Sequence, residues 1–255
     1  MYLAEQNCLV LNPTKSKFIV LGSKKQVSSI LSATPEIKIM GENIQRVETA
    51  RNLGLTMDPE LRFEMHIGNV IRNCFYRLKI LYRFRQYLSE PLRRRLVDSL
   101  VLSRLNYCDV VYGPCLLSRT DRLIQRVQNA CARFCFNIPR RSHVTSFLND
   151  ANILKMAARR DLHMATLLFG IFKKQSPKYL YDKIIWKQDN ARYSLHPTTN
   201  PLSMPSYRTS AFRGSFKFRA TRCWNCIPPP CRSKNSKHGF KHVYIQYLLL
   251  HQKQR

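Results

Sequence analysis

The spacing of apolar residues changes at Asp58, and this change limits the folds open to the chain. Before Asp58, short apolar runs are separated by turn residues, a pattern typical of β-strands. After it, apolar residues recur every three or four positions, which is typical of amphipathic α-helices. The sequence therefore predicts an α+β fold, with short β-hairpins at the N-terminus, a mostly α-helical bundle, and a basic, partly extended C-terminal region.

Two β-hairpins and one further strand are predicted before Asp58. The first hairpin joins residues 8–11 to 18–21 across Asn12-Pro13-Thr14, and the second joins 37–39 to 44–47 across Gly41-Glu42-Asn43. The further strand covers 53–57 and includes Gly54. Because glycine weakens a strand interior, Gly54 indicates close approach of another backbone or a ligand.

Three consecutive amphipathic helices are predicted at 60–88, 90–112 and 118–137. Asp58 is expected to cap the first, and Ser118 with Asp121 forms an acidic variant of a capping box for the third. The residues expected to be buried are Ile67, Ile71, Cys74, Leu78 and Leu81 in the first helix, Leu92, Leu96, Leu100 and Val101 in the second, and Leu123, Val127, Ala130 and Phe134 in the third.

The remaining sequence is predicted to contain one long helix and a basic arm. The helix covers about 153–174 and ends before Ser176-Pro177. Residues 190–255 contain 12 Lys and Arg and no acid, and are rich in Pro, Ser and Thr as far as Pro230. We expect an extended arm anchored by Trp224, then a short helix bearing Phe240, Val243, Tyr244 and Tyr247. The predicted division is 1–58, 59–140, 141–189 (a helical connection) and 190–255.

The charge of the chain predicts a polyanionic partner. Among 255 residues, 43 Lys and Arg face 15 Asp and Glu, a formal charge of +28, which makes an ordinary metabolic enzyme a poor interpretation. Nucleic acid is the commonest polyanion that such a charge matches. A membrane is disfavoured, because the longest uncharged apolar run, 162–172, has 11 residues. The first residues lack the basic segment of a signal peptide, so an intracellular, nuclear or cytoplasmic, location is expected.

The basic residues of the three helices are candidate nucleic-acid contacts. Residues 62–140 contain 15 Lys and Arg against 5 Asp and Glu. A single helix face of this kind is usually just solvated. The same bias on three consecutive helices favours phosphate contact, and the candidate residues are Arg62, Arg72, Lys79, Arg83, Arg119, Arg122, Arg126 and Arg133.

The nine cysteines favour buried thiols in a reducing compartment, since the count is odd and most lie in apolar helical pattern. Cys223, Cys226, Cys231 and His238 form the one weak zinc candidate, because their spacing is only loosely knuckle-like. Trp224 and three consecutive prolines would constrain such a loop. We therefore predict structural cysteines and no metal site.

No complete active site is predicted from the residues alone. A metal-dependent polymerase or nuclease needs carboxylates that converge on Mg²⁺, and the chain has no Asp-Asp or Asp-x-Asp pair. The eight glycines do not cluster into a phosphate-binding loop. The residues thus predict a binding surface, no catalytic residue and no bound cofactor.

The order of several motifs resembles the C-terminal part of the reverse transcriptase of non-LTR retrotransposons, of the jockey or a related animal type. The motifs are the runs 9–17, 52–58, 102–108, 123–129 and 224–228, which cover nearly the whole chain in the expected order. Single motifs such as Leu11-Asn12-x-x-Lys15 are weak, and their order and spacing carry the resemblance.

The resemblance implies the end of the polymerase palm, a thumb over 59–140 and the segment that follows. The catalytic aspartates would precede the first residue, so Mg²⁺ is expected only in a full-length polymerase. Lys15 would approach the incoming triphosphate, and Leu53, Gly54 and Leu55 would form the primer grip. The expected partners are RNA and DNA, as template, primer and hybrid duplex. Two alternatives stay open: a non-catalytic RNA- or DNA-binding protein, and an inert transposon relic.

Overall fold

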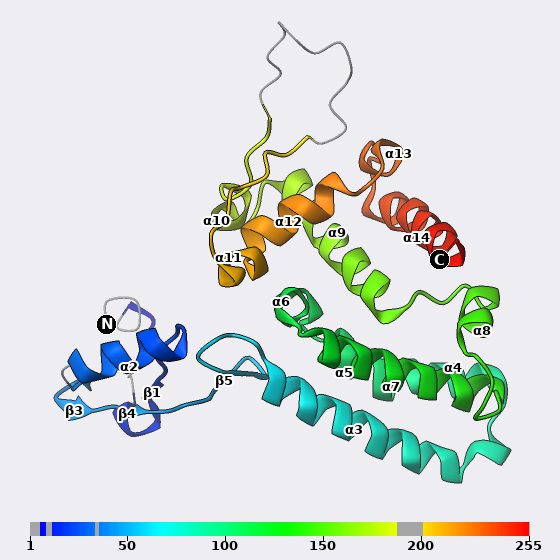
Figure 1. The fold of residues 1–255 in the computed structure, drawn as a ribbon, viewed down its shortest axis with the longest axis horizontal. Coiled ribbons are helices and arrows are strands. Elements are labelled where there is room, and N and C mark those ends of the chain that lie inside the picture. Colours follow the sequence, from blue (N-terminus) through cyan, green and yellow to red (C-terminus); the bar gives the residue numbers. More distant parts are fainter. Residues whose placement is uncertain (1–5, 9–11, 34–35, 188–200, 255) are drawn as a thin grey trace, which may run out of the picture. The chain divides into compact units, whose positions relative to one another are not determined.

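The computed structural model describes residues 6–8, 12–33, 36–187 and 201–254, and its fold is α+β, as predicted (Figure 1). Short strands lie near the N-terminus, and helices form the bulk of the protein. The chain divides into two compact units, 1–67 and 68–255. The helices expected to form a bundle therefore share one unit with the C-terminal segments.

The described part of the N-terminal unit contains three two-stranded sheets, a 3₁₀ helix and the helix α2 (Lys24–Ala33), and α3 (Glu64–Arg83) begins at its end. Strand β1 (Lys17–Phe18) pairs in parallel with β4 (Gln45–Arg46), whereas β2 (Lys38–Ile39) pairs antiparallel with β3 (Glu42–Asn43), and β5 (Ala50–Asn52) with β6 (Leu55–Met57). The 3₁₀ helix η1 (Pro13–Lys15) precedes β1, and helix α2 (Lys24–Ala33) follows it.

The first predicted hairpin is corrected by this pairing. Residues 9–11 lie outside the described residues, and the described partner of Phe18 is the parallel strand β4. The expected turn is a helical turn, because Asn12 Oδ1 accepts a hydrogen bond from the backbone N–H of Lys15 at 3.1 Å. Helix α2 was not predicted, and Val27 is its buried residue.

A hairpin is observed where the second was predicted, but its turn is Met40-Gly41, and its second strand is β3 (Glu42–Asn43). Within the predicted strand 44–47, Gln45–Arg46 pairs with β1 instead. Gly54 is not inside a strand as predicted. It lies with Leu53 in the two-residue turn between β5 and β6. Leu53 and Gly54 have φ values of 46° and 85°, and positive φ at both central residues is the geometry of a type I′ turn. The sequence signal that indicated close backbone approach is thus explained by the turn.

Helix α3 (Glu64–Arg83) begins four residues later than predicted. Asp58 does act as a cap, but for the turn before the helix, where its carboxylate accepts the N–H groups of Arg62 at 2.9 Å and Phe63 at 2.6 Å. The predicted apolar stripe of this helix is confirmed, since all five of its residues are at most 8% exposed.

The unit 68–255 is built from short and long helices. In chain order after α3 they are η2 (Arg85–Tyr87), α4 (Glu90–Val97), the π-helical segment η3 (Asp98–Leu102), α5 (Ser103–Asn106), α6 (Asp109–Tyr112), η4 (Gly113–Cys115), α7 (Ser118–Phe136), α8 (Thr145–Asp150), α9 (Met156–Lys174), α10 (Lys178–Tyr181), α11 (Ser210–Gly214), α12 (Phe216–Asn225), α13 (Pro229–Arg232) and α14 (Lys237–Lys253).

The helix predicted over 90–112 is interrupted after Asn106, where Cys108 takes a left-handed conformation with φ of 54°. Val101 is buried as predicted, and Val97 and Leu105 are among the other buried side chains of this segment. Of the remaining predicted residues, Leu96 is half-buried, and Leu92 and Leu100 are 42% and 38% exposed. The core-facing stripe is therefore rotated from the predicted one.

Helix α7 matches the predicted range closely, but its buried face is also rotated. Val127 and Phe134 are buried as expected, whereas Leu123 is 39% exposed and Ala130 is only half-buried. The predicted capping box is absent. No side chain caps the first turn of α7, and the carboxylate of Asp121 instead pairs with Arg160 of α9.

The C-terminal segment forms part of the core of unit 68–255, which corrects the predicted extended arm. Helices α12 and α14 pack against α9, the helix predicted as a connection. The rings of Phe169, Trp224, Phe240 and Tyr244 stack along this contact, with Phe169 and Phe240 centroids 4.7 Å apart. Trp224 is a buried anchor as predicted, but α14 is a long helix of 17 residues. Residues 188–200 of the predicted arm lie outside the described residues.

No helix among the described residues combines the length and apolar character needed to cross a lipid bilayer.

Candidate nucleic-acid interface

One face of α3 carries a row of exposed cations interrupted by an aromatic ring. Arg72, Tyr76, Lys79 and Arg83 follow one another at intervals of four, three and four residues, so they lie in line along the helix. All four side chains are exposed, and Tyr76 is 64% exposed. We call this set the α3 stripe. It lies opposite the buried residues of the same helix, because those residues fall about half a turn away.

The cations of the α3 stripe have no acidic partner within the described part of the chain. No ion pair involves Arg72, Lys79 or Arg83, whereas Arg62, at the preceding turn, pairs with Glu60 at 2.8 Å. Arg62 belongs to the N-terminal unit. The predicted contacts of the first helix therefore divide into three unpaired cations on the stripe and one cation with a carboxylate partner.

The inner face of α3 holds the stripe in position. The thiol of Cys74 donates to the carbonyl of Val101 at 3.5 Å, and the Tyr82 and Phe134 rings meet edge to face at 5.0 Å. Burial raises the pKa of Cys74 to about 11, so this thiol stays protonated and acts as a packing group. The helix is thus fixed against η3 and the end of α7.

Two arginines beyond α3 stabilise the end of α7. Arg85 donates to the carbonyls of Phe134 at 3.1 Å and Arg133 at 2.9 Å. Arg93 is 8% exposed, and it donates to the same Phe134 carbonyl at 3.2 Å and to Asn137 Oδ1 at 2.8 Å. Cations favour the negative end of the helix dipole, so both guanidinium groups have a structural role there.

These groups also surround a cavity of about 500 Å³ at the end of the α3 stripe. Its lining has no acidic side chain and consists of Tyr82, Arg83, Arg85, Gln86, Leu88, Arg93 and Asn137. The guanidinium of Arg85 lies over the Tyr82 ring, 5.4 Å from its centroid. Arg83 belongs both to the stripe and to this cavity, so the positively charged surface extends past the end of α3.

Helix α7 carries a second exposed basic row. Arg119, Arg122 and Arg126 are exposed and lie on one face, at intervals of three and four residues. Arg133 differs, because its guanidinium donates to the carbonyl of Ser142 at 3.0 Å and of Arg140 at 3.4 Å. The structure thus brings three of the four α7 candidates together, and Arg133 joins the end of α7 to the loop that follows.

Two of the four N-terminal candidates, Lys15 and Leu53, are exposed, whereas Gly54 is half-buried and Leu55 is buried. Lys15 ends η1 with its side chain exposed. Leu53 is 84% exposed at the tip of the β5–β6 hairpin, and Leu55, at 7%, packs inward. Leu53 and Gly54 thus form the turn of a hairpin, and not part of the strand predicted over 53–57. The unit places an aliphatic side chain at its tip.

His66 supports the strand that follows this turn. Its Nδ1 accepts a hydrogen bond from the N–H of Thr56 in β6 at 3.3 Å, which requires an unprotonated ring nitrogen. Burial, and then the charge of Arg51, lower the pKa of His66. The neutral imidazole is therefore the form that fits the folded unit.

The zinc candidates do not form a ligand set. Within residues 6–8, 12–33, 36–187 and 201–254, no three His, Cys, Asp or Glu side chains are placed to hold a metal ion. Cys226 and His238 are exposed, whereas Cys231 is buried. Burial raises the pKa of Cys223 and of Cys231, which disfavours the thiolates that zinc requires. The cysteines described are free thiols.

Sequence reasoning missed Tyr76 and the structural use of Arg85 and Arg93. Tyr76 was detectable, because its spacing from Arg72 and Lys79 places it on the predicted polar face. The roles of Arg85 and Arg93 had no local signal, since their acceptors lie more than 40 residues away.

No protein-family model, curated protein or solved structure matches this chain.

Proposed function

We propose that this chain binds nucleic acid through the α3 stripe, as the template- and primer-holding part of a non-LTR retrotransposon reverse transcriptase. The observation that carries the proposal is the row of three cations on one helix face without acidic partners. Phosphates are the natural partners of such a row, and contacts to them carry no sequence information.

The stripe has the dimensions of a phosphate-tracking surface. With a rise of about 1.5 Å per residue, Lys79 lies about 10 Å along the helix from Arg72, and Arg83 about 6 Å further. Long flexible side chains at these separations reach successive phosphates of one strand. Tyr76, which lies between the cations, offers a face on which an unpaired base can stack.

The resemblance gives the remaining parts of the proposal. The β5–β6 hairpin with Leu53 and Gly54 holds the primer end, and Lys15 approaches the incoming triphosphate. The described residues do not fit the Mg²⁺ ions of such a polymerase, because no three of their His, Cys, Asp or Glu side chains are placed to hold a metal ion. This chain contributes binding, and it acts in an intracellular ribonucleoprotein, nuclear or cytoplasmic.

The test measures binding of an RNA–DNA hybrid and of duplex DNA at several salt concentrations. Log affinity should fall steeply with log salt and depend little on sequence. Replacing Arg72, Lys79 and Arg83 with Gln removes three phosphate contacts, so for duplex DNA the slope should become shallower by about 2.7, at about 0.9 per contact.

The matched control replaces Lys173, Lys174 and Lys178 with Gln. These three lysines are exposed and lie at the end of α9 and in α10, so the variant loses the same charge away from the stripe. Equal changes in slope for the two variants would show that net charge, and not the α3 stripe, binds the nucleic acid. Absence of binding at low salt would leave the inert relic as the better interpretation.

A second experiment tests the reverse transcriptase assignment independently of nucleic-acid binding. The chain alone should extend no primer with Mg²⁺ or Mn²⁺, and fusion to the upstream polymerase segment of a related element should restore extension. In that fusion, Lys15→Ala should slow nucleotide addition more than it weakens template binding. A folded fusion that binds hybrid but never extends a primer would refute the reverse transcriptase assignment and leave the binding proposal intact.

A further inference from the structure

The cavity of about 500 Å³ at the end of the α3 stripe contains two guanidinium groups that meet at one atom. Arg85 Nε and Arg93 Nη1 both donate to the carbonyl oxygen of Phe134, at 3.1 Å and 3.2 Å. The two side chains come from separate elements, η2 and α4. Because the two groups meet at one oxygen atom, one small anion beside that oxygen can contact both.

The positive charge of this pair exceeds the negative charge that the described residues place beside it. No carboxylate among them pairs with Arg83, Arg85 or Arg93, and none lines the cavity. The end of α7 carries about half a negative elementary charge, whereas Arg85 and Arg93 each carry a full positive charge. Arg93 is 8% exposed, and its Nε is buried without a hydrogen-bond partner among the described residues. A buried charge of this kind is costly unless an anion compensates it.

Donor groups of three side chains remain for a ligand after the internal hydrogen bonds are made. Arg85 uses Nε and Nη2 for the carbonyls of Phe134 and Arg133, so its Nη1 remains. Arg93 uses Nη1 for Phe134 and Asn137, so its Nη2 remains. Asn137 accepts through Oδ1, so its Nδ2 remains. Several N–H donors on and beside two guanidinium groups match the oxygens of a phosphate group.

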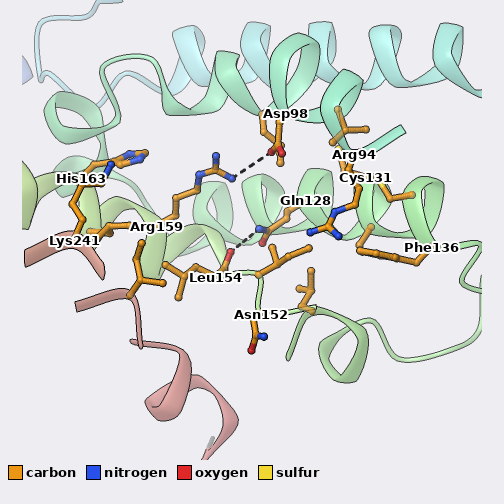
Figure 2. A pocket seen from close by; sticks show the side chains of 18 residues that line it. Arg94, Asp98, Gln128, Cys131, Phe136, Asn152, Leu154, Arg159, His163 and Lys241 are labelled. Carbon is orange, nitrogen blue, oxygen red and sulfur yellow. Dashed lines mark hydrogen bonds and ion pairs between the residues drawn. The ribbon is translucent and has the colours of Figure 1, made fainter. Parts of the chain in front are cut away.

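A different cavity of the same unit, beside Arg94, has a carboxylate among its charges (Figure 2). Its volume is about 370 Å³, and its walls come from α4, η3, α7, α8, α9 and α14. Figure 2 shows Arg159 beside Asp98, at 3.9 Å, so the protein itself balances this guanidinium. The unpaired guanidinium groups at the end of the α3 stripe are therefore the more favourable place for an anion.

The position of the cavity favours a phosphate of nucleic acid over other anions. Arg83 lines the cavity and is also the last cation of the α3 stripe, so a strand that follows the stripe reaches the cavity. Among the lining side chains, only Tyr82 and Leu88 offer apolar surface, so an anion with a large apolar body finds little to pack against.

We propose that Arg85, Arg93 and Asn137 hold one phosphate group of the nucleic-acid strand that lies along the α3 stripe. This inference rests on the proposed function and adds one fixed contact to it. The stripe cations are exposed, so they speed association and give it salt dependence. A phosphate beside the buried Arg93 is largely removed from water, so it slows dissociation. Either the end of the strand or an internal position supplies this phosphate.

The experiment measures the association and dissociation rates of an RNA–DNA hybrid with the full chain by stopped-flow fluorescence. Gln86→Glu places a carboxylate in the lining of the cavity, and the exposed Gln86 side chain makes no hydrogen bond to the described residues. This variant should dissociate about tenfold faster, with the association rate within about twofold of the native value. The matched control is Gln246→Glu, which makes the same charge change at an exposed position of α14 and should alter neither rate by more than about twofold.

Two further variants separate the cavity from the α3 stripe. Arg85→Lys keeps the charge and removes the planar fork, so it should also speed dissociation, with a circular dichroism melt to show that the variant folds. Replacing Arg72 and Lys79 together with Gln should instead slow association and flatten its salt dependence.

Hybrids with and without a 5′-phosphate on the DNA strand distinguish the two sources of the phosphate. Slower dissociation of the phosphorylated hybrid, lost in Gln86→Glu, would identify the strand end. Equal dissociation of the two hybrids, faster for both in Gln86→Glu, would identify an internal phosphate.

Three outcomes would overturn the proposal. Equal dissociation rates for Gln86→Glu and Gln246→Glu would refute the cavity contact and leave binding by the α3 stripe intact. Tighter binding of polyglutamate than of the hybrid, with that preference lost in Gln86→Glu, would assign the cavity to an acidic protein. Absence of hybrid binding to the native chain would refute the proposed function, and the cavity contact with it.

Discussion

Gln252 joins the last helix to the start of α9, and its removal should destabilise the unit 68–255. The residue is 8% exposed in α14. Its Oε1 accepts the backbone N–H of Lys155 at 2.7 Å, and its Nε2 donates to Asn149 Oδ1 at 2.9 Å and to the carbonyl of Ile153 at 3.0 Å. The first N–H groups of a helix have no partner within the helix, so Gln252 provides what the start of α9 lacks.

The substitution Gln252→Met keeps the length of the side chain and removes all three hydrogen bonds. A hydrogen bond within a protein contributes about 0.5–1.5 kcal/mol, so the expected loss is about 1.5–4.5 kcal/mol in the free energy of unfolding. The upper part of this range applies where a buried group is left without any partner.

The matched control is Gln246→Met, which makes the same replacement at an exposed position of the same helix. It should change the free energy of unfolding by less than about 0.5 kcal/mol. Both variants are measured by urea unfolding, with circular dichroism and the fluorescence of the buried Trp224 as probes. Coincident transitions and an unchanged urea slope would show that the comparison is between stabilities. If Gln252→Met cost no more than Gln246→Met, the docking of α14 on the start of α9 would be refuted.

Three further predictions concern helix α3 and the N-terminal unit. Leu78→Ala should lower the free energy of unfolding by about 2–5 kcal/mol, because the Leu78 side chain is 3% exposed. Leu92 is 42% exposed, so Leu92→Ala should lower it by less than about 0.5 kcal/mol, and urea unfolding measures both. In the β5–β6 turn, Gly54→Ala should destabilise the hairpin by about 1–2 kcal/mol, and Leu53→Asn should stabilise it because Asn tolerates a left-handed conformation. Amide exchange of the hairpin measures both effects, and faster exchange in Leu53→Asn than in Gly54→Ala would contradict the turn geometry. The folded unit lowers the pKa of His66, so the contribution of this residue to stability is fully present above the unfolded pKa of about 6.5 and is lost as the pH falls through the lower, folded pKa. His66→Gln should remove this pH dependence from the urea midpoint, and a midpoint of the native chain that did not change between pH 8 and 5 would contradict the prediction.

Helical periodicity predicted the long elements well and the faces of the shorter ones poorly. The buried stripe of α3 was correct in every position, because five apolar residues at regular spacing leave one orientation for the helix. The stripe from Leu92 to Leu100 was wrong by one position, because α4 turns Arg93 and Val97 inward, and Arg93 is buried since its guanidinium donates to the Phe134 carbonyl. A pattern of apolar residues does not predict a buried arginine whose acceptor lies 41 residues away.

The N-terminal strands were harder to predict because most are two residues long. Periodicity over so few positions carries little information, and pairing partners are set by the rest of the unit. The turn at Met40-Gly41 was missed because methionine rarely takes a positive φ, here 52°. Turn-forming residues at Gly41 and Asn43 gave the approximate place of the hairpin and not its register.

The sequence predicted which helices carry the exposed basic residues of the candidate interface, but it did not predict which side chains those residues contact. Exposed basic residues on α3 and α7 follow from amphipathic spacing. Which arginines contact backbone carbonyls does not, because the bond from Arg93 to Phe134 spans 41 residues and depends on how two helices meet. The cavity beside Arg94 is likewise absent from the sequence pattern, since its walls come from six separate elements.

The packing of α9 against α12 and α14 has a consequence for how the protein is made. The ribosome synthesises Lys155 and must add 97 more residues before Gln252 exists. At about 5–20 residues per second, this interval lasts about 5–20 seconds. Until α12 is complete at Asn225, the apolar face of α9, with Leu168 and Phe169, has neither of the helices that bury it, and it then lacks α14 until the end of the interval. Exposed apolar surface of this kind on a nascent chain is a target for chaperones, and the rate of translation between Lys155 and Gln252 sets how long the exposure lasts.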